Sequence, residues 1–281
     1  MRQANEDPAI ALELIHRHAL GIIKSFIEIC ERHSLRYIAV AGTALGAVRH
    51  QGFIPWDDDV DFGMPRDDYE QFLAIAPKEL PENLSLHFFP RNADYMAYFS
   101  KVCDKNTVYI DQDTKRLKDY PHHIWIDIFP IDKISCDKKT QRNHLRKNAF
   151  LYELFKCKTT WTVSSLSSGT KKLFGSIFRP ALRILTFWIS KQKAYELLTK
   201  QLQKFDNEKT DYCLVFATGG EKNIFRMEEL FPGKKVRFEN LIIPIPNNYD
   251  KVLQQAYGNY WALPPENQRY GHKAIEVREV K

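Results

Sequence analysis

The sequence predicts an α+β fold, in which a mixed β-sheet is flanked by helices and a helical, basic insertion divides the chain. Apolar runs of strand length alternate with stretches whose apolar residues recur every three to four positions. A basic and aromatic segment separates the two parts in which that alternation is regular. The 281 residues are 44% hydrophobic and 27% charged, which is typical of a folded protein with a sizeable core.

Each expected element follows from a local pattern. Asp7 before Pro8 is typical of a helix start, and Pro77 and Pro81 end a later helix. The elements expected in order are a helix over 7–33, a strand over 37–41, a Gly42-Thr43 turn, a helix over 44–49, a strand over 57–62, a helix from Arg66, strands over 84–89, 96–102, 107–110 and 124–129, a hairpin of 235–238 with 241–245, and a helix over 249–257 closed by Gly258.

The stretch from Ile38 to Met64 carries the clearest chemistry. Gly42 lets a backbone or a phosphate approach closely, and the amides at the start of the following helix point at anions. If the acidic segment is a strand, Asp57, Asp59 and Asp61 share one face, with neighbouring carboxylates roughly 6–7 Å apart. Three like charges there repel unless a cation neutralises them. The segment therefore predicts a metal site, with a solvated acidic turn as the alternative.

A family resemblance rests on this same stretch. The residues that carry it are GTALG at 42–46, Arg49-His50 and GFIPWDDDVD at 52–61. They resemble the LicD family, which includes bacterial phosphorylcholine transferases and has the fukutin-type ribitol-phosphate transferases as relatives. A second matching string ends the chain, so the resemblance covers about residues 10–130 and 225–275. It implies a polymerase-β-like nucleotidyltransferase core and phosphotransfer.

The resemblance assigns roles to the acids. It implies that Asp59 and Asp61 hold Mg²⁺, with Mn²⁺ as the alternative ion, against the pyrophosphate of a donor, while Asp57 ligates a second ion or holds waters. Enzymes of this type carry a third carboxylate on a neighbouring strand. Asp127, inside the apolar alternation of 124–129, fits that place as the base for an acceptor hydroxyl. Asp132 is the alternative, expected in a turn after a proline.

Other residues near the acids are expected to bind substrate. Gly42 and Thr43 are expected to contact phosphate through the backbone and the hydroxyl. Arg49 is expected to add positive charge there, with a structural salt bridge as the alternative. Trp56 is expected to stack on a base or face a quaternary ammonium group, with a place in the core as the alternative.

Three more basic residues are expected at the phosphates. Lys101, near the end of a strand, is expected to contact phosphate, and a surface lysine is the alternative. Arg269 and His272 follow the last expected helix and are predicted to bind the pyrophosphate, with a disordered tail as the alternative.

The positive charge of the chain is concentrated in its middle. Between Lys156 and Lys204 there are ten Lys or Arg residues and one acid, Glu196. Residues 171–193 interleave cations with aromatic and aliphatic residues, which predicts peripheral contact with an anionic membrane or, alternatively, a helix packed on the core. The net charge of +6 comes without a nucleic-acid-reading motif, so no nucleic acid is expected.

Three parts are expected: a nucleotidyltransferase-like catalytic core over 1–135, a helical basic and aromatic insertion over 136–210, and a hairpin and helix over 211–281 that complete the core. Five scattered cysteines suit a reducing compartment. Charged residues near the start argue against a signal peptide, and no apolar run reaches the ~18–20 residues of a membrane span. The expected location is cytoplasmic, or peripheral at the inner face of the membrane.

The resulting hypothesis is an enzyme that transfers a phospho-alcohol group to a hydroxyl of a cell-surface glycan or its lipid-linked precursor, such as teichoic acid, lipopolysaccharide or capsule. The resemblance favours CDP-choline as donor, with CDP-ribitol and CDP-glycerol as alternatives. Nucleotide transfer and metal-dependent phosphate hydrolysis use the same residues and stay open. A non-enzymatic binding module is the weakest alternative, because every expected acid is present.

Overall fold

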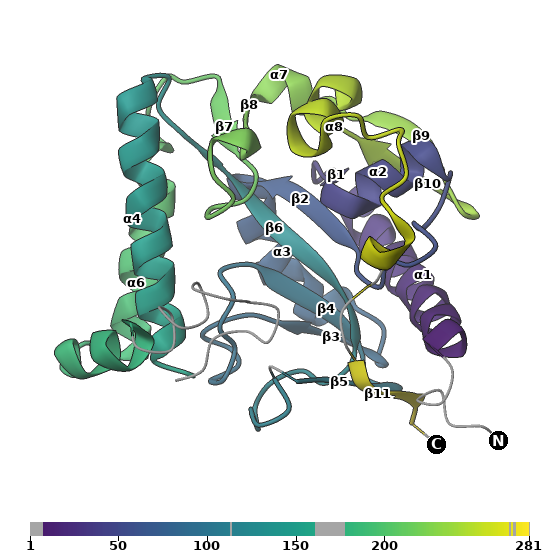
Figure 1. The fold of residues 1–281 in the computed structure, drawn as a ribbon, viewed down its shortest axis with the longest axis horizontal. Helices are drawn as coiled ribbons and strands as arrows, with labels where there is room; N and C mark the ends of the chain where they lie inside the picture. Colours follow the sequence, from purple (N-terminus) through teal and green to yellow (C-terminus); the bar gives the residue numbers. More distant parts are fainter. Residues whose placement is uncertain (1–7, 113, 161–177, 270, 272–273, 281) are drawn as a thin grey trace.

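A computed structural model describes residues 8–112, 114–160, 178–269, 271 and 274–280. Its centre is a seven-stranded sheet in the order β1-β2-β6-β4-β3, and β7 and β8 continue from the far end of β6. β2 and β6 are parallel, whereas the other pairs are antiparallel. In Figure 1, α1 and the pair α4–α6 lie at opposite sides of the molecule, with the sheet between them. The mixed α+β architecture predicted from the sequence is confirmed.

The helices and strands have the following bounds. The helices are α1 Pro8–Arg32, α2 Ala41–Arg49, α3 Arg66–Glu79, α4 Lys138–Cys157, α6 Lys191–Leu202, α7 Met227–Leu230 and α8 Tyr249–Tyr257, and residues 178–185 are also helical. The strands are β1 Ile38–Ala39, β2 Asp61–Pro65, β3 Leu84–His87, β4 Ser100–Asp104, β5 Thr107–Asp111, β6 Ile124–Lys133, β7 Tyr212–Leu214, β8 Ile224–Arg226, β9 Lys234–Phe238, β10 Leu241–Ile245 and β11 Ala274–Glu279.

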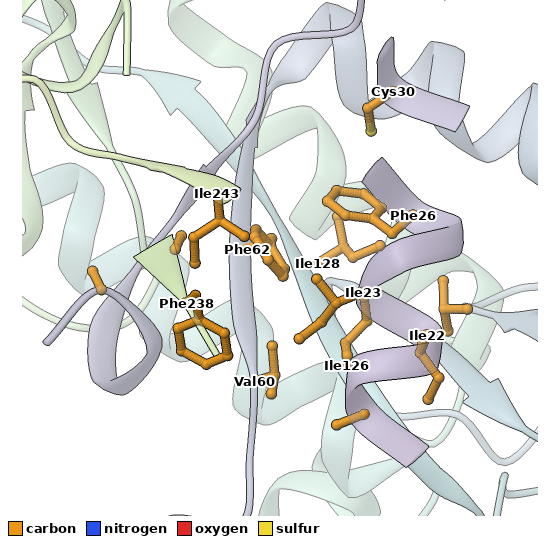
Figure 2. Packing of buried hydrophobic residues seen from close by; sticks show 14 of the residues in the cluster. Ile22, Ile23, Phe26, Cys30, Val60, Phe62, Ile126, Ile128, Phe238 and Ile243 are labelled. Atoms are coloured by element: carbon orange, nitrogen blue, oxygen red, sulfur yellow. The ribbon is translucent and has the colours of Figure 1, made fainter. Parts of the chain in front are cut away.

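The apolar face of α1 fixes the main core. Phe26 is fully buried, and its ring centroid lies 5.0 Å from that of Phe62 in β2. Figure 2 shows side chains of α1, β2, β6 and the β9–β10 hairpin converging on one cluster, which contains Ile22, Ile23, Phe26, Cys30, Val60, Phe62, Ile126, Ile128, Phe238 and Ile243. This packing holds β2 and β6, the two strands that carry the acids, in a fixed position.

The helix α1 contains a glycine that contributes nothing to packing. Gly21 is exposed, and an added Cβ would meet no atom within 4 Å. Gly21→Ala should therefore stabilise the protein by about 1 kcal/mol, because glycine costs that much in a helix interior. Urea unfolding measures the change. Gly46→Ala is the contrasting variant, since its Cβ would lie 2.5 Å from the carbonyl oxygen of Gly52, and it should destabilise. A destabilising Gly21→Ala would contradict the continuous helix.

The structure corrects two expectations about the first strand and turn. The strand β1 ends at Ala39, and α2 begins at Ala41, so Gly42 and Thr43 lie in the first turn of the helix. The reason is local, because Ala41 has φ +46° and turns the chain sharply after the short strand. A non-glycine residue in this conformation costs about 1–2 kcal/mol and is typical of functional sites.

Further boundaries differ from the expected ones. The strand β2 begins at Asp61, so the earlier acids of the segment lie in irregular chain before it. Consecutive aspartates have a low strand propensity, which explains the late start. The strand β6 continues through Pro130 to Lys133, so the expectation of a turn at Asp132 is wrong. Long α1, α3, the β9–β10 hairpin and α8 with Gly258 at its end are confirmed. Pro77, however, lies inside α3, which continues to Glu79, so the expectation that Pro77 ends this helix is wrong.

The part after β6 consists of α4 and α6, which pack against each other beside the sheet (Figure 1). The Ser/Gly-rich stretch at 164–169, whose composition favours an internal boundary, lies outside the described residues. The chain returns to the sheet through β7, which pairs with the end of β6, and β11 pairs with β5. The three-part division of the chain stays a prediction.

Candidate active site

Two acids lie side by side on the two parallel strands at the centre of the sheet. The register of β2 and β6 pairs Asp61 with Asp127, so adjacent strands place their backbones about 4.8 Å apart. Both residues are buried. The N–H of Asp127 also donates to the carbonyl oxygen of Val60, at 2.7 Å, which locks the start of the pairing. The prediction that Asp127 lies on a strand neighbouring the acidic segment is confirmed.

Lys101 joins this pair from the other neighbour of β6. The β4–β6 register places it opposite Asp127, and its Nζ lies 2.8 Å from Asp127 Oδ1, with side-chain exposures of 8% and 10%. Its ammonium also lies 3.8 Å from the ring centroid of Trp125. The alternative of an ordinary surface lysine is therefore wrong. The structure places Lys101 on a carboxylate, and its contact with phosphate stays a prediction.

The side chains of the three acids before β2 do not all point in the same direction. The Tyr109 hydroxyl donates to Asp58 Oδ2 at 3.1 Å, and Asp58 is buried. Asp57 and Asp59 are half-buried, and their charges act on Asp61. The alternation expected of a strand is thus retained in part, although the strand itself begins later.

Burial and neighbouring negative charges raise the pKa of two acids in this cluster. Burial, followed by the nearby charges of Asp59, Asp127 and Asp57, raises the pKa of Asp61 well above its usual value, and Lys101 opposes the effect. Burial also raises the pKa of Asp127, against the ion pair with Lys101. Crowded carboxylates of this kind are stabilised by a bound cation. Among the described residues, however, no three His, Cys, Asp or Glu side chains converge as a complete metal cage.

The first turn of α2 contacts the acids directly. The backbone N–H of Asp61 donates to Thr43 Oγ1 at 2.8 Å, so the hydroxyl oxygen fixes the start of β2. An added Cβ at Gly42 would lie 2.4 Å from Asp57 Oδ2, so glycine is needed there for the close approach of that carboxylate. Thr43 is buried. Both residues lie at the site as predicted, and their contact with phosphate is still untested.

His16 of α1 holds the backbone of the acidic loop, residues 57–60, which precedes β2. Its Nε2 lies 2.7 Å from the carbonyl oxygen of Asp57, so this nitrogen carries a proton and donates it. The ring stacks on Phe53 at a centroid distance of 3.9 Å. Burial lowers the pKa of His16. The contact holds the loop through its backbone and leaves the Asp57 carboxylate facing α2.

The remaining basic and aromatic candidates form the rim of the site. Arg49, in the last turn of α2, donates to the carbonyl oxygens of Tyr260 at 2.7 Å and Ala262 at 3.4 Å. Trp56 is half-buried, and the Arg269 guanidinium lies 5.3 Å from its ring centroid. Arg49 thus anchors the chain after α8, and Arg269 is folded onto the acidic loop. His272 lies outside the described residues.

A mostly apolar cavity of about 290 Å³ lies beside the start of α2. It is lined by the start of α2, the region of β7 and β8, and α8, through Val40, Ala41, Ala44, Val215, Phe216, Gly219, Lys222, Asn223, Phe225, Leu230, Pro246, Val252, Leu253, Ala256 and Tyr257. Burial raises the pKa of Tyr257, as do the charges of Asp61, Asp57 and Asp59. Tyr257 therefore lines the cavity and also lies within electrostatic reach of the acids.

Asp132, the alternative to Asp127, forms an ion pair with Arg66. Arg66 donates to it twice, from Nε to Oδ1 at 2.7 Å and from Nη2 to Oδ2 at 2.8 Å, and both side chains are largely buried. This bidentate pair joins α3 to β6. Sequence reasoning also missed Tyr109 and His16, which contact the acidic segment, and Tyr257, whose pKa the acids raise. No local spacing signals these neighbours, because they come from distant parts of the chain.

Comparison with known proteins agrees with the motif. Residues 34–164 match the family described as LicD/FKTN/FKRP, nucleotidyltransferase domain. A protein of Haemophilus influenzae named lipopolysaccharide cholinephosphotransferase LicD is 28% identical over 263 residues, which are 92% of this chain and 94% of that protein. Uncharacterized proteins of Rickettsia typhi and Rickettsia prowazekii are 42% and 40% identical over 57 residues, 20% of this chain and 18% and 21% of theirs.

The matched region contains every acid of the cluster, from Asp57 to Asp127, together with Lys101. The long alignment with the Haemophilus protein extends the likeness to nearly the whole chain. Residues 34–164 of the chain therefore resemble the nucleotidyltransferase domain of the LicD family.

Proposed function

We propose that this protein is a phosphotransferase that moves phosphocholine from CDP-choline to a hydroxyl of a cell-surface glycan or its lipid-linked precursor. The observation that carries the proposal is the pairing of Asp61 and Asp127 on adjacent strands beside the first turn of α2. The name of the Haemophilus relative supports choline phosphate as the transferred group and lipopolysaccharide as an acceptor of the right kind. CDP-ribitol and CDP-glycerol are the alternative donors.

The acid cluster fits a magnesium ion. Its donors are all oxygen, and the pKa of Asp61 is raised first by burial and then by the neighbouring negative charges, which a divalent cation would neutralise. Mg²⁺ takes few carboxylates and completes its coordination with substrate phosphates and water. Asp59 and Asp61 would hold the ion, with Asp57 as a further ligand. Bound there, Mg²⁺ would neutralise charge on the donor pyrophosphate.

Asp127 is proposed as the base for the acceptor hydroxyl. A buried carboxylate with a raised pKa is better matched to that role than an exposed one. Lys101 favours the ionised form of Asp127, because the ion pair opposes the effect of burial. As the hydroxyl proton passes to Asp127, Lys101 is released from its carboxylate partner and becomes available to the departing phosphate.

Different regions around the acids would bind different parts of the donor. The first turn of α2, with Gly42 and Thr43, would receive the phosphates at a helix N-terminus. The apolar cavity bordered by Tyr257 would receive an organic part of the donor. Arg49, Trp56 and Arg269 stay proposed substrate contacts at the rim, and His272, outside the described residues, stays a proposed substrate contact.

The finer description of the fold is part of the same proposal. We take β1, α2, β2 and β6 as the polymerase-β-like nucleotidyltransferase core, with residues 136–210 as an insertion. No helix in the described ranges combines the length and apolar character that a bilayer span requires. A cytoplasmic protein with peripheral contact at the inner face of the membrane is proposed on the composition of 171–193.

Donor binding tests the proposal. Calorimetry with CDP-choline, CDP-ribitol, CDP-glycerol and CTP, each with and without Mg²⁺, should give Mg²⁺-dependent binding of CDP-choline. Productive binding of CTP alone would instead support nucleotide transfer. Release of free phosphocholine without an acceptor would support a hydrolase. Binding of none of the four compounds would contradict the proposed donor.

Gly42→Ala tests the contact between α2 and the acidic loop. The new Cβ displaces the Asp57 carboxylate, so we expect transfer to fall about tenfold or more while the Tm changes little, because misplacement of about 1 Å can cost far more in rate than in stability. Gly21→Ala is the matched control, since it makes the same chemical change where nothing is within 4 Å. Full activity in Gly42→Ala would show that the position of Asp57 is unimportant.

A further inference from the structure

An apolar tip projects from the helical part of the molecule. The four most exposed large apolar side chains of the described residues are Ile184, Leu185, Phe187 and Trp188, at 64%, 68%, 81% and 70%. They are almost consecutive in sequence, at the end of the helix over 178–185 and in the turn before α6. In Figure 1 this segment lies at the lower left, at the end of the α4–α6 pair and away from the sheet.

The tip is held in a defined position by polar contacts behind it. Lys158 Nζ donates to the carbonyl oxygen and to Oγ1 of Thr186, at 2.6 and 2.8 Å. Arg183 donates to the carbonyl oxygen of Cys157 at 3.1 Å. Leu182 is buried in the core between α4 and α6. The exposed residues are therefore presented by an anchored turn, and Phe187 and Trp188 pack edge to face at 5.2 Å.

The segment that carries the tip is rich in cations, although acids of other elements lie near two of them: Glu153 pairs with Arg179 at 2.7 Å, and the charges of Asp94 and Asp119 act on Lys191. Within residues 178–204 there are six Lys or Arg residues and one acid, Glu196. The cations next to the tip in sequence are Arg183, Lys191 and Lys193. Lys158, the residue that follows the end of α4, contacts the tip through Thr186. Lys191 donates to the carbonyl oxygen of Ala93, and Lys193 pairs with Glu196 at 3.2 Å. An apolar, aromatic tip with a cationic collar complements an anionic lipid surface.

We propose that residues 184–188 insert into the interfacial region of an anionic bilayer and dock the enzyme there. Aromatic side chains favour that depth, and the cations behind them would meet the anionic headgroups. Leu182 and Arg179 are buried, so the helix over 178–185 does not lie flat on the bilayer as an amphipathic helix. Its exposed end, at residues 184–188, inserts into the bilayer instead. The docking gives the proposed transferase access to a lipid-linked acceptor, and only that consequence rests on the proposed function.

Vesicle sedimentation of the full-length protein tests the inference. We expect binding to phosphatidylcholine vesicles that contain phosphatidylglycerol, weaker binding to phosphatidylcholine alone, and weaker binding at high salt. The double variant Phe187→Ser, Trp188→Ser should lose binding by about tenfold or more, since two interfacial aromatic side chains are removed. Trp261→Ser is the matched control, because Trp261 is also exposed, at 58%, but lies outside the tip.

Three outcomes would overturn the inference: no binding of the wild type to the anionic vesicles, equal binding by the double variant, or equal loss in Trp261→Ser. Self-association through the tip without vesicle binding, seen by light scattering, would assign the surface to a second copy of the chain. Asp61→Asn should still bind vesicles, and the double variant should still transfer to a water-soluble acceptor. Failure of docking and failure of the proposed function are thereby separated.

Discussion

Asp61→Asn should abolish transfer, with a loss of about 10³-fold or more, because a metal-binding carboxylate contributes several kcal/mol to stabilising the transition state. The substitution keeps the shape of the side chain and the hydrogen bond that its backbone N–H donates to Thr43 Oγ1. The fold should therefore survive. Steady-state transfer assays at saturating Mg²⁺ measure the loss, and Mg²⁺-dependent donor binding should disappear with it.

The stability of the same variant separates chemistry from folding. The pKa of Asp61 is raised in the folded state, so its ionised form costs stability above the unfolded-state pKa of about 4. Metal-free Asp61→Asn should therefore have a Tm equal to or above that of the wild type at pH 7. The gap should close as the pH falls below about 4, where the aspartate is protonated in both states. A variant that unfolds at pH 7, or one that stays fully active, would contradict the assignment.

Lys101→Met should destabilise the protein by about 3–5 kcal/mol, because it leaves the Asp127 carboxylate buried without its cation. Methionine keeps the length and the apolar contacts of the lysine stem beside Trp125. Urea unfolding measures the cost. Loss of Lys101 raises the pKa of Asp127 further, so the destabilisation should be greatest at neutral pH and should shrink as the pH falls and Asp127 becomes protonated.

The double variant Lys101→Met, Asp127→Asn is the control for that result. Removing both charges should recover most of the lost stability, since a neutral pair carries no buried charge. The double-mutant cycle then gives a coupling energy that belongs to the pair and not to either residue. A cost below about 1 kcal/mol for the single variant would show that the ion pair is absent in solution.

The sequence was most informative where a local pattern carries its own physical cause. The apolar period of α1, the hairpin of β9 and β10, and α8 with Gly258 were all predictable in this way. The acids of the site could be predicted as well, because Asp61 follows a short helix and Asp127 interrupts an apolar alternation. Their direct pairing on parallel strands could only be hypothesised.

What the sequence could not reveal depends on contacts between distant segments. Strand register brings Lys101 opposite Asp127, a pairing that the sequence did not predict, and its contact with phosphate stays a prediction. Asp132 reads as a turn residue after a proline, yet β6 continues through Pro130 and Arg66 of α3 binds the carboxylate. Nothing in the local sequence of α1 indicates that His16 stacks on Phe53 and holds the backbone of Asp57.

The central claim is that the phospho-alcohol half of the donor reaches the acceptor. The most direct measurement uses CDP-choline labelled either in choline or in cytidine, with Mg²⁺ and with lipopolysaccharide, teichoic acid or capsule as acceptor. Our account predicts that the choline label becomes attached to one of these glycans while the cytidine label is released as CMP. Attachment of the cytidine label, or release of both labels in free form in the presence of each acceptor, would contradict it.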